Sequence, residues 1–413
     1  MRTNEPIIEW PKEGVRRVPF KLYTSPEIYA KETHSVFRGP AWHFLALAVE
    51  LPNNGDFKNT FVGEIPIIVV RDKTGEINAM VNRCTHKGAL VCHDKKGNKP
   101  VFTCPYHNWS FDQTGKLVGV AFRNGVKGVG GMPDTFKTED HGLEPLRVAI
   151  YNGLIFGTFS SETPDIETYL GPEARQFIDR VFNRPIKILG QYSQGLRNNW
   201  KLMMENTRDT YHAGILHLFF NTFGLNRLSM EGGIVMSNEG RHHVSYSKLL
   251  TDDVTGSDYE DNKLPNMRKG LQLSDPSVGT YRPEFEDGIT LQIQTIFPTF
   301  LIQQIQNCLG IRQLIPRGLD KAELIWTLFG YEDDDEEMTQ TRIKQSNLVG
   351  PAGFVSLEDG AVLDFVQRSL RESPDDSSVV ELGDETDYTT TKHRVTETAV
   401  RAYWDHYRDL MGL

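Results

Sequence analysis

Two short cysteine–histidine knuckles impose the strongest constraint on how this chain can fold. Cys84-x-His86 is followed, after seventeen residues, by Cys104-x2-His107. Two thiolates and two imidazoles brought together make a metal site, so the fold must place the two knuckles face to face. Structural zinc uses the same four donors, but zinc fingers prefer both cysteines in one knuckle. One cysteine and one histidine per knuckle suit a [2Fe–2S] cluster, with Cys84 and Cys104 on one iron and His86 and His107 on the other.

The composition excludes several classes of protein. A chain of 413 residues with 38% hydrophobic and 24% charged residues is expected to be globular and to contain two domains. A net charge of −10, without a basic block, argues against nucleic acid or an anionic membrane surface as a partner. No run approaches the ~18 apolar residues of a membrane span, and no signal peptide is apparent, so the cytoplasm is the expected location. Four cysteines could form two disulfides, but a metal role suits a cytosolic enzyme better.

The residue pattern changes twice along the chain. Residues 1–40 are mixed and form a separate N-terminal segment, expected to pack on the catalytic domain. Over residues 41–160, short β-rich runs alternate with hairpin-turn signals such as Asp72–Gly75 and Asp112–Gly115, which predicts a small all-β domain. Residues 161–413 mix both patterns and predict an α+β domain around an antiparallel sheet. The helical patterns cover Ile166–Phe182, Trp200–Phe220, Asp335–Leu348 and Thr396–Met411, and the stretches Thr251–Arg282 and Ser373–Thr391 are expected to be long loops.

A second constellation, Asp209-x2-His212-x4-His217, lies in the second predicted helix. Asp209 and His212 are i,i+3 neighbours on a regular helix. His212 and His217 are about 140° out of phase at ~100° per residue. The helix must therefore deform, and Ala213-Gly214 is the expected place. Two histidines and one carboxylate make the facial triad that leaves open positions on Fe(II), and a candidate carboxylate lies within Gly350–Gly360.

These segments, together with Asn82–Gly88, Cys104–Trp109, Gly125–Pro133 and Gln303–Asn307, resemble the large subunits of Rieske-type ring-hydroxylating oxygenases over nearly the whole chain. The resemblance implies an all-β Rieske domain placed before an α+β catalytic domain, whose helix-grip-like antiparallel sheet carries mononuclear Fe(II). It makes Asp359, next to Glu358, the third iron ligand. It also implies that Asp209 bridges to a Rieske histidine of the neighbouring subunit and carries electron transfer.

Within this family the chain is similar to the branch that acts on aromatic carboxylates, including terephthalate, salicylate and anthranilate. Such a substrate needs a fixed cation, and an arginine fork fits a planar carboxylate. Arg312 stands in an otherwise uncharged, strand-like run, where an unpaired arginine is costly. In the terephthalate enzymes, arginines at the positions of Arg312 and Arg394 hold the two carboxylates. The alternative for each is a structural ion pair, and one arginine would suffice for a monocarboxylate.

The expected protein partners follow from the family resemblance and from motifs that this sequence lacks. No Gly-x-Gly-x-x-Gly fingerprint follows a strand, so NADH and flavin are expected on a separate reductase, with or without a ferredoxin between them. The resemblance implies a small β subunit in an α3β3 assembly, with α3 as the alternative. The expected reaction is O2-dependent cis-dihydroxylation of an aromatic carboxylate, with terephthalate as the best candidate. Two alternatives stay open: a salicylate- or anthranilate-type hydroxylase or dioxygenase, and a Rieske electron carrier. Asn206 and Tyr211 are expected either beside the iron ligands or in packing. Cys92 and His93 are expected to be packing or surface residues.

Overall fold

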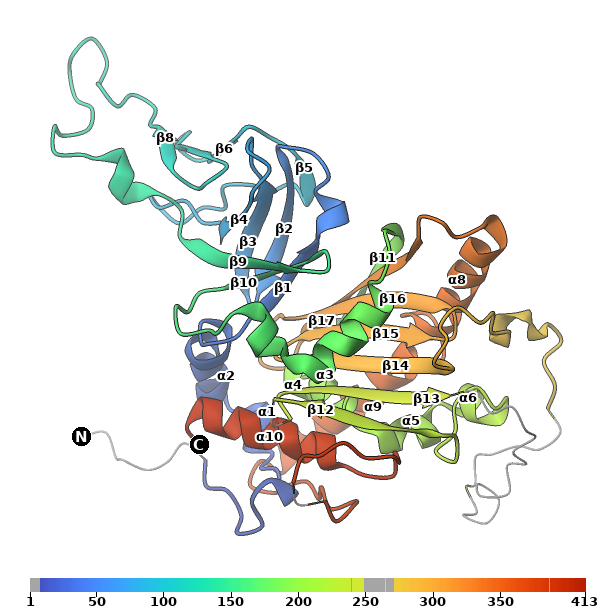
Figure 1. Ribbon diagram of the computed structural model, residues 1–413. Helices are drawn as coiled ribbons and strands as arrows, with labels where there is room; N and C mark the ends of the chain where they lie inside the picture. Colours follow the sequence, from blue (N-terminus) through green and yellow to red (C-terminus); the bar gives the residue numbers. More distant parts are fainter. Residues whose placement is uncertain (1–7, 239, 249–263, 265–270, 386) are drawn as a thin grey trace. The chain divides into compact units, whose positions relative to one another are not determined.

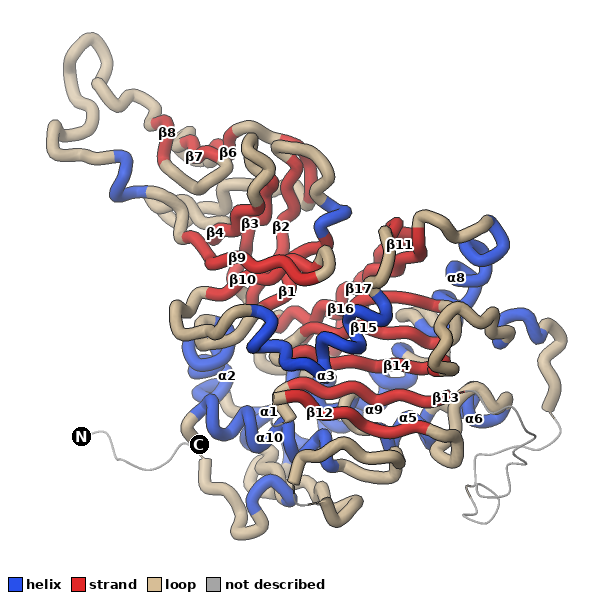
Figure 2. The backbone as a smooth tube through the Cα atoms, viewed as in Figure 1, coloured by secondary structure: helices blue, strands red, loops and turns tan. Residues whose placement is uncertain are grey.

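The computed structural model describes residues 8–238, 240–248, 264, 271–385 and 387–413. The chain divides into two compact units, which we call the small unit (Phe37–Ile166) and the large unit (Met1–Val36 with Glu167–Leu413). In Figures 1 and 2 the small unit consists mainly of strands, whereas the large unit combines a broad sheet with helices. The described residues up to Val36 therefore belong to the large unit, where Pro19 forms a β-bridge with Ser377.

The small unit contains two antiparallel sheets. Its core is a cluster of buried apolar side chains that also includes Cys84 and Cys104. Both predicted hairpin turns are confirmed: the Asp72 carboxylate accepts from Thr74 N (2.8 Å) and that of Asp112 from Thr114 N (2.8 Å). In spatial order, the strands are β1 (His43–Leu47), β10 (Leu154–Thr158), β9 (Pro145–Tyr151), β4 (Ile77–Val81), β3 (Ile65–Arg71), β2 (Asp56–Val62) and β5 (Lys96–Asn98) in one sheet, and β6 (Val101–Thr103), β7 (Ser110–Asp112) and β8 (Leu117–Gly119) in the other.

The large unit is built on one seven-stranded antiparallel sheet. In spatial order, its strands are β11 (Ile186–Leu196), β17 (Ala322–Tyr331), β16 (Cys308–Pro316), β15 (Phe300–Ile305), β14 (Ile289–Ile296), β13 (His242–Lys248) and β12 (Gly232–Ser237). Successive side chains of a strand face opposite sides of the sheet. The even-numbered side of β14 carries Gln294, which donates to Ala174 O of helix α3 (Ile166–Val181) at 2.7 Å. The opposite side carries Leu291 and Ile293, which line a cavity together with residues of α4 (Trp200–Asn206) and α5 (Thr210–Leu216).

Helices therefore cover both faces of this sheet, with α3 on one face and α5 and α9 on the other (Figure 1). One prediction is wrong here: the single helix expected over Trp200–Phe220 is three short helices. The helices are α1 (Lys21–Thr24), α2 (Pro26–Glu32), α3 (Ile166–Val181), α4 (Trp200–Asn206), α5 (Thr210–Leu216), α6 (Leu218–Thr222), α8 (Glu336–Val349), α9 (Ser356–Glu372) and α10 (Thr398–Met411).

A fully buried ion pair fixes α4 to the N-terminal segment. Lys201 Nζ lies 2.5 Å from Glu32 Oε1, and both side chains are completely buried. Buried charges are costly unless their remaining hydrogen-bonding capacity is used. Here Trp200 Nε1 and Tyr407 OH also donate to the Glu32 carboxylate. The contacts tie α2 (Pro26–Glu32), α4 (Trp200–Asn206) and α10 (Thr398–Met411) together.

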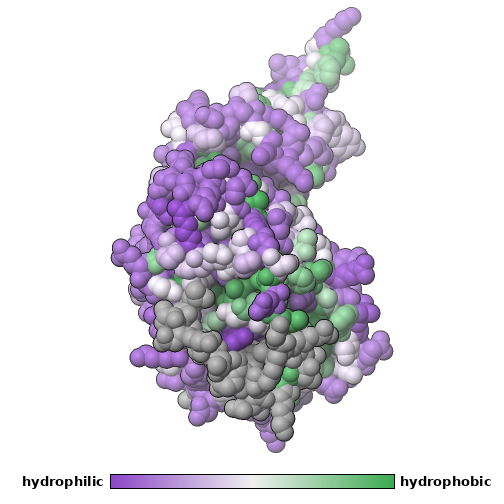
Figure 3. All heavy atoms as spheres, turned by 90° about the vertical axis from the view of Figure 1, so that its right-hand side faces the viewer, coloured by the Kyte–Doolittle hydropathy of each residue, from purple (hydrophilic) through white to green (hydrophobic). Residues whose placement is uncertain are grey.

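The two expected long loops differ in how many of their residues the structure describes. Most of Thr251–Arg282 lies outside the described residues, and its described part includes the short 3-10 helix η5 (Pro276–Gly279). The described residues of Ser373–Thr391 form no helix or strand. In the view of Figure 3 the surface is mainly hydrophilic, with apolar side chains gathered over part of the large unit. Among the described residues, no helix has the length and apolar character needed to span a bilayer.

Candidate metal centres and the cavity beside them

The small unit brings the two knuckles together. Cys84 follows β4 and Cys104 follows β6, and in each knuckle the cysteine carbonyl accepts a turn-closing hydrogen bond, from Gly88 N (2.8 Å) and Asn108 N (3.0 Å). Gly88 and Asn108 have positive φ, which lets the backbone turn back within so few residues. The rings of His86 and His107 have their centroids 4.6 Å apart. The two histidines therefore lie against each other, and the two cysteines are close enough for Cys104 to act on the Cys84 thiol.

Their environment fits a Rieske cluster. Both cysteines are buried whereas both histidines are half-buried, so the thiol side faces the core and the imidazole side faces outward. Burial and the adjacent Cys104 raise the pKa of the Cys84 thiol, so a metal is needed to hold this sulfur as a thiolate. His86 Nδ1 is buried without a hydrogen-bond partner, while its ring stacks on Trp109 at 4.8 Å. A buried ring nitrogen without a partner is the donor that a metal satisfies.

In the large unit, the chain breaks its helix at a candidate ligand. Helix α5 ends at Leu216, and His217 has non-helical backbone angles (φ −80°, ψ 74°) before α6 begins at Leu218. The break, and not a distortion at Ala213-Gly214, turns the His217 ring toward that of His212. Gly214 serves another purpose: a Cβ there would lie 2.2 Å from Leu228 Cγ, so the glycine allows close packing.

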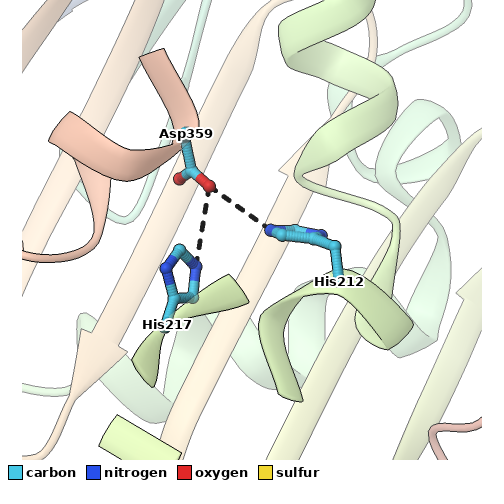
Figure 4. Close-up of side chains that lie close together, drawn as sticks. All are labelled: His212, His217 and Asp359. Atoms are coloured by element: carbon cyan, nitrogen blue, oxygen red, sulfur yellow. Dashed lines mark ion pairs between the residues drawn. The ribbon is translucent and has the colours of Figure 1, made fainter. Parts of the chain in front are cut away.

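The carboxylate arrives from a third element. Asp359 lies in the first turn of α9, and its Oδ1 is 3.4 Å from His212 Nε2 and 3.6 Å from His217 Nε2 (Figure 4). The three ligand atoms lie within 4.8 Å of one another. Both imidazoles thus present the same type of nitrogen to one carboxylate oxygen, which is the donor set of a 2-His-1-carboxylate triad.

Two further carboxylates stand behind the histidines. Asp209 Oδ2 is 3.6 Å from His212 Nδ1, and Glu358 Oε2 is 2.8 Å from His217 Nδ1. Such outer partners fix the ring orientation and tautomer of a metal-binding histidine. Asp209 acts from the N-cap of α5, where its Oδ1 accepts from Tyr211 N and His212 N, and not from one face of a continuous helix. The role of Glu358 was not foreseen from the sequence.

The charges around the triad favour a cation. Burial lowers the pKa of His212, but Asp209 and Asp359 outweigh this effect and raise it to about 10. Burial raises the pKa of Asp359, yet the neighbouring histidines and Arg312 leave it below its usual value. The pocket therefore stabilises positive charge where the three ligand atoms meet, as a divalent iron would supply it. The Asn206 amide nitrogen also faces this point, 3.2 Å from His212 Nε2, whereas Tyr211 is exposed.

A cavity opens directly beside the triad. Its walls come from the helices on one side and from the sheet on the other. The lining residues are Asn206, Thr207, Asp209, Thr210, His212, Ala213, His217, Phe220, Asn226, Ser245, Leu291, Ile293, Ile305, Arg312, Val355, Asp359 and Arg394. The metal candidates, apolar side chains and both predicted arginines thus share one space.

The two arginines are held differently. Arg312 is 3% exposed, lies 4.8 Å over the Trp326 ring, and has no hydrogen-bond partner at Nε. Burial lowers its pKa to about 10, so it still carries its charge at neutral pH. Arg394 is 2% exposed and donates to Asn226 Oδ1 (2.7 Å) and to the carbonyl oxygen of Arg227, which are neutral acceptors.

Comparison with known proteins decides what kind of chain this is. A Rieske [2Fe–2S] domain matches residues 41–129, and the catalytic domain of ring-hydroxylating alpha subunits matches residues 183–413. The chain belongs to the ring-hydroxylating alpha-subunit family. It is 47% identical over 99% of its length to the terephthalate 1,2-dioxygenase terminal oxygenase component subunit alpha 2 of Comamonas sp, covering 98% of that protein. It is 44% identical over 98% of its length to the anthranilate 1,2-dioxygenase large subunit of Burkholderia cepacia, covering 96% of it.

The fold agrees with this assignment. Naphthalene 1,2-dioxygenase from Rhodococcus sp., bound to indole, superposes with a TM-score of 0.79 at 24% identity, over 96% of this chain and 94% of that one. The predicted fold class and cofactors are confirmed. This chain is the alpha subunit of a multicomponent aromatic ring-hydroxylating dioxygenase, an oxidoreductase, with a Rieske [2Fe–2S] cluster and a mononuclear iron. The zinc alternative for the knuckles and the electron-carrier alternative for the chain are therefore wrong.

The contact between Glu358 and His217 leads to a prediction. Glu358→Gln should weaken iron binding by about 10–100-fold, because the variant loses the anionic acceptor that orients the His217 ring. Iron retention against a graded chelator measures the effect, while the visible spectrum of the cluster should not change. Glu372→Gln, at the exposed end of the same helix, is the control. Wild-type iron retention in Glu358→Gln would show that the 2.8 Å contact is incidental.

Proposed function

We propose that this alpha subunit cis-dihydroxylates a para-benzenedicarboxylate, with terephthalate as the best candidate. The observation that carries the proposal is that Arg312 and Arg394 line the same cavity as His212, His217 and Asp359. A carboxylate entering a buried cavity loses its hydration, and a guanidinium fork replaces it with two charge-assisted hydrogen bonds. Two arginines in one cavity suit a dianion.

The placement of the arginines supports a long substrate with two charged ends. Arg312 is on β16, whereas the Arg394 side chain approaches β12, with its Nε 3.2 Å from where a Cβ of Gly232 would be. Three strands of the sheet lie between β16 and β12. Of these, β14 contributes Leu291 and Ile293 to the cavity wall, β15 contributes Ile305, and β13 contributes Ser245. An apolar middle between two cationic ends fits an aromatic ring with a carboxylate on each side.

Each group of residues has a distinct task in this proposal. Cys84, His86, Cys104 and His107 hold the cluster, and His212, His217 and Asp359 hold the iron. When bound, the cluster supplies electrons and the iron supplies O2 activation. Asp209 orients His212 and bridges toward the cluster of a neighbouring subunit. The arginines fix the substrate, and the apolar wall excludes water from it.

The proposal extends to the assembly. We infer that electrons reach the cluster from NADH through a separate reductase, directly or through a ferredoxin. The names of the relatives support a multicomponent system, since they describe a "terminal oxygenase component subunit alpha" and a "large subunit". A small β subunit in an α3β3 assembly is the partner we expect, with α3 as the alternative.

Substrate kinetics test the arginines. Arg312→Ala and Arg394→Ala should each lower kcat/KM for terephthalate by roughly a hundredfold, because each strands one carboxylate of the bound dianion, at a cost of a few kcal/mol. On benzoate only one of the two variants should matter, namely the one lacking the arginine that binds the single carboxylate. Arg197→Ala, at an exposed position, is the control.

The monocarboxylate alternative has its own support. The anthranilate relative covers the chain as fully as the terephthalate relative, at nearly the same identity. Arg394 already donates to Asn226 and Arg227, as a structural residue would. If the wild type turns over anthranilate or salicylate and ignores terephthalate, Arg394 is structural and the dicarboxylate proposal is wrong.

A further inference from the structure

One buried glutamine in the large sheet differs from its neighbours. Gln292, Gln294 and Gln304 are completely buried, and each side-chain amide donates to a backbone carbonyl, at 3.2, 2.7 and 3.1 Å respectively. Gln303 is also completely buried, yet neither its Oε1 nor its Nε2 has a hydrogen-bond partner. A buried polar group without a partner destabilises the folded chain, so such groups call for an explanation.

Strand register places Gln303 on the cavity side of the sheet. It pairs with Ile293 of β14 and Gly310 of β16 and is two residues from Ile305. Ile293 and Ile305 both line the cavity. Since side chains two apart on a strand share a face, Gln303 faces the cavity side. Gln304 faces the other side, where Arg180 of α3 donates to it (2.6 Å).

Gln303 also lies diagonally across from Arg312. Arg312 pairs with Leu301, and Gly310, the partner of Gln303, is two residues before Arg312 on the same face. Gly310 has no side chain, and Gln303 Cγ lies 3.7 Å from where its Cβ would be. Diagonal neighbours in an antiparallel pair are within reach of long side chains. Gln303 and Arg312, whose side chains each contain a nitrogen without a hydrogen-bond partner, are thus diagonal neighbours on one face of the sheet. Of the two, Arg312 lines the cavity directly.

We propose that Gln303 is a substrate-binding and specificity-determining residue, whose Nε2 donates to the carboxylate held by Arg312. The inference rests on the proposed function and deepens it. A carboxylate offers about four lone-pair sites, of which a guanidinium fork uses two. A neutral amide supplies a further donor without burying another charge. A carboxylate that accepts hydrogen bonds from both the Arg312 guanidinium and the Gln303 amide is held in one orientation. That orientation determines which ring carbon faces the triad.

Binding and stability should change in opposite directions when the amide is removed. In the holoenzyme, Gln303→Leu should raise the Kd for terephthalate by about tenfold to a hundredfold, the range for a hydrogen bond to a charged group. The Tm without substrate should stay the same or rise, because an unsatisfied buried amide is removed. Gln294→Leu is the matched control: it loses a bond to Ala174 O, so its Tm should fall while its Kd stays unchanged.

Calorimetric titration with terephthalate and benzoate, combined with melting curves, decides the question. If Gln303→Leu binds as tightly as the wild type, or its Tm falls as in Gln294→Leu with Kd unchanged, Gln303 is structural and the inference is wrong. Gln303→Met, with similar length and no polar atoms, repeats the test if the leucine variant does not fold. A wild type that binds neither carboxylate overturns the proposed function as well, whereas wild-type binding with an unaffected Gln303→Leu overturns the inference alone.

Discussion

Asp209→Asn is expected to remove nearly all turnover while both metal sites stay loaded. The variant keeps the local fold, because asparagine is as good an N-cap as aspartate and its Oδ1 can still accept from Tyr211 N and His212 N. What it loses is the charge on Oδ2, which lies 3.6 Å from His212 Nδ1. In our proposal that oxygen connects His212 to a histidine of the neighbouring subunit, so electron delivery fails although no ligand is lost.

Three measurements check this prediction together: iron content, the visible spectrum of the cluster, and O2 uptake coupled to product formation. Asp335→Asn is a matched control, since Asp335 is the N-cap of α8, accepts from Met338 N (2.7 Å) and does not line the cavity. It should lower stability slightly through its lost pairing with Arg282 and leave turnover unchanged. Full coupled activity in Asp209→Asn would show that the carboxylate is only a helix cap.

The motif residues could be predicted because their geometry is local. In each knuckle three or four residues supply both donors, so spacing alone identifies Cys84, His86, Cys104 and His107 as a group. The Asp-x2-His-x4-His spacing is a weak signal by itself, and it points to His212 and His217 because it follows these knuckles in the chain. The hydrophobic periodicity does not predict where the helix that carries His212 ends, because the backbone leaves the helical conformation at His217 itself. A conformation that orients a ligand side chain overrides the local propensity.

The elements and contacts that depend on tertiary packing were not predictable. Helix α9 carries Asp359, yet it lacks a capping signal: its N-cap is Val355, with no side-chain hydrogen bond. Because the sequence does not predict this helix, it cannot predict which way each side chain of the helix faces. That orientation directs Glu358 to His217 and Asp359 to the point between the two histidines. The sequence also does not predict that the Gln303 amide lacks a hydrogen-bond partner, because Gln303 is one of several glutamines in adjacent strands.

Replacing Asp359 should have the most complete effect on the iron site. Asp359→Asn keeps the shape of the side chain, but it removes the one carboxylate whose oxygen is near Nε2 of both His212 and His217. It also removes the negative charge that balances the buried Arg312 guanidinium, which then repels a metal cation beside it. Two neutral imidazoles and an uncompensated arginine should not retain Fe(II). We expect iron content and turnover to fall to background.

The loss should be confined to this centre, because Cys84, His86, Cys104 and His107 belong to the other compact unit and Asp359 to the large one. The cluster spectrum of Asp359→Asn should therefore equal that of the wild type, and iron content should fall from three to two per chain, as expected when one mononuclear iron is lost and two cluster irons stay. Glu358→Gln, one residue away, should lose iron only under chelator challenge, since it removes a partner of a ligand and not a ligand. Stoichiometric mononuclear iron in Asp359→Asn would exclude this aspartate as a ligand and direct attention to Glu358 instead.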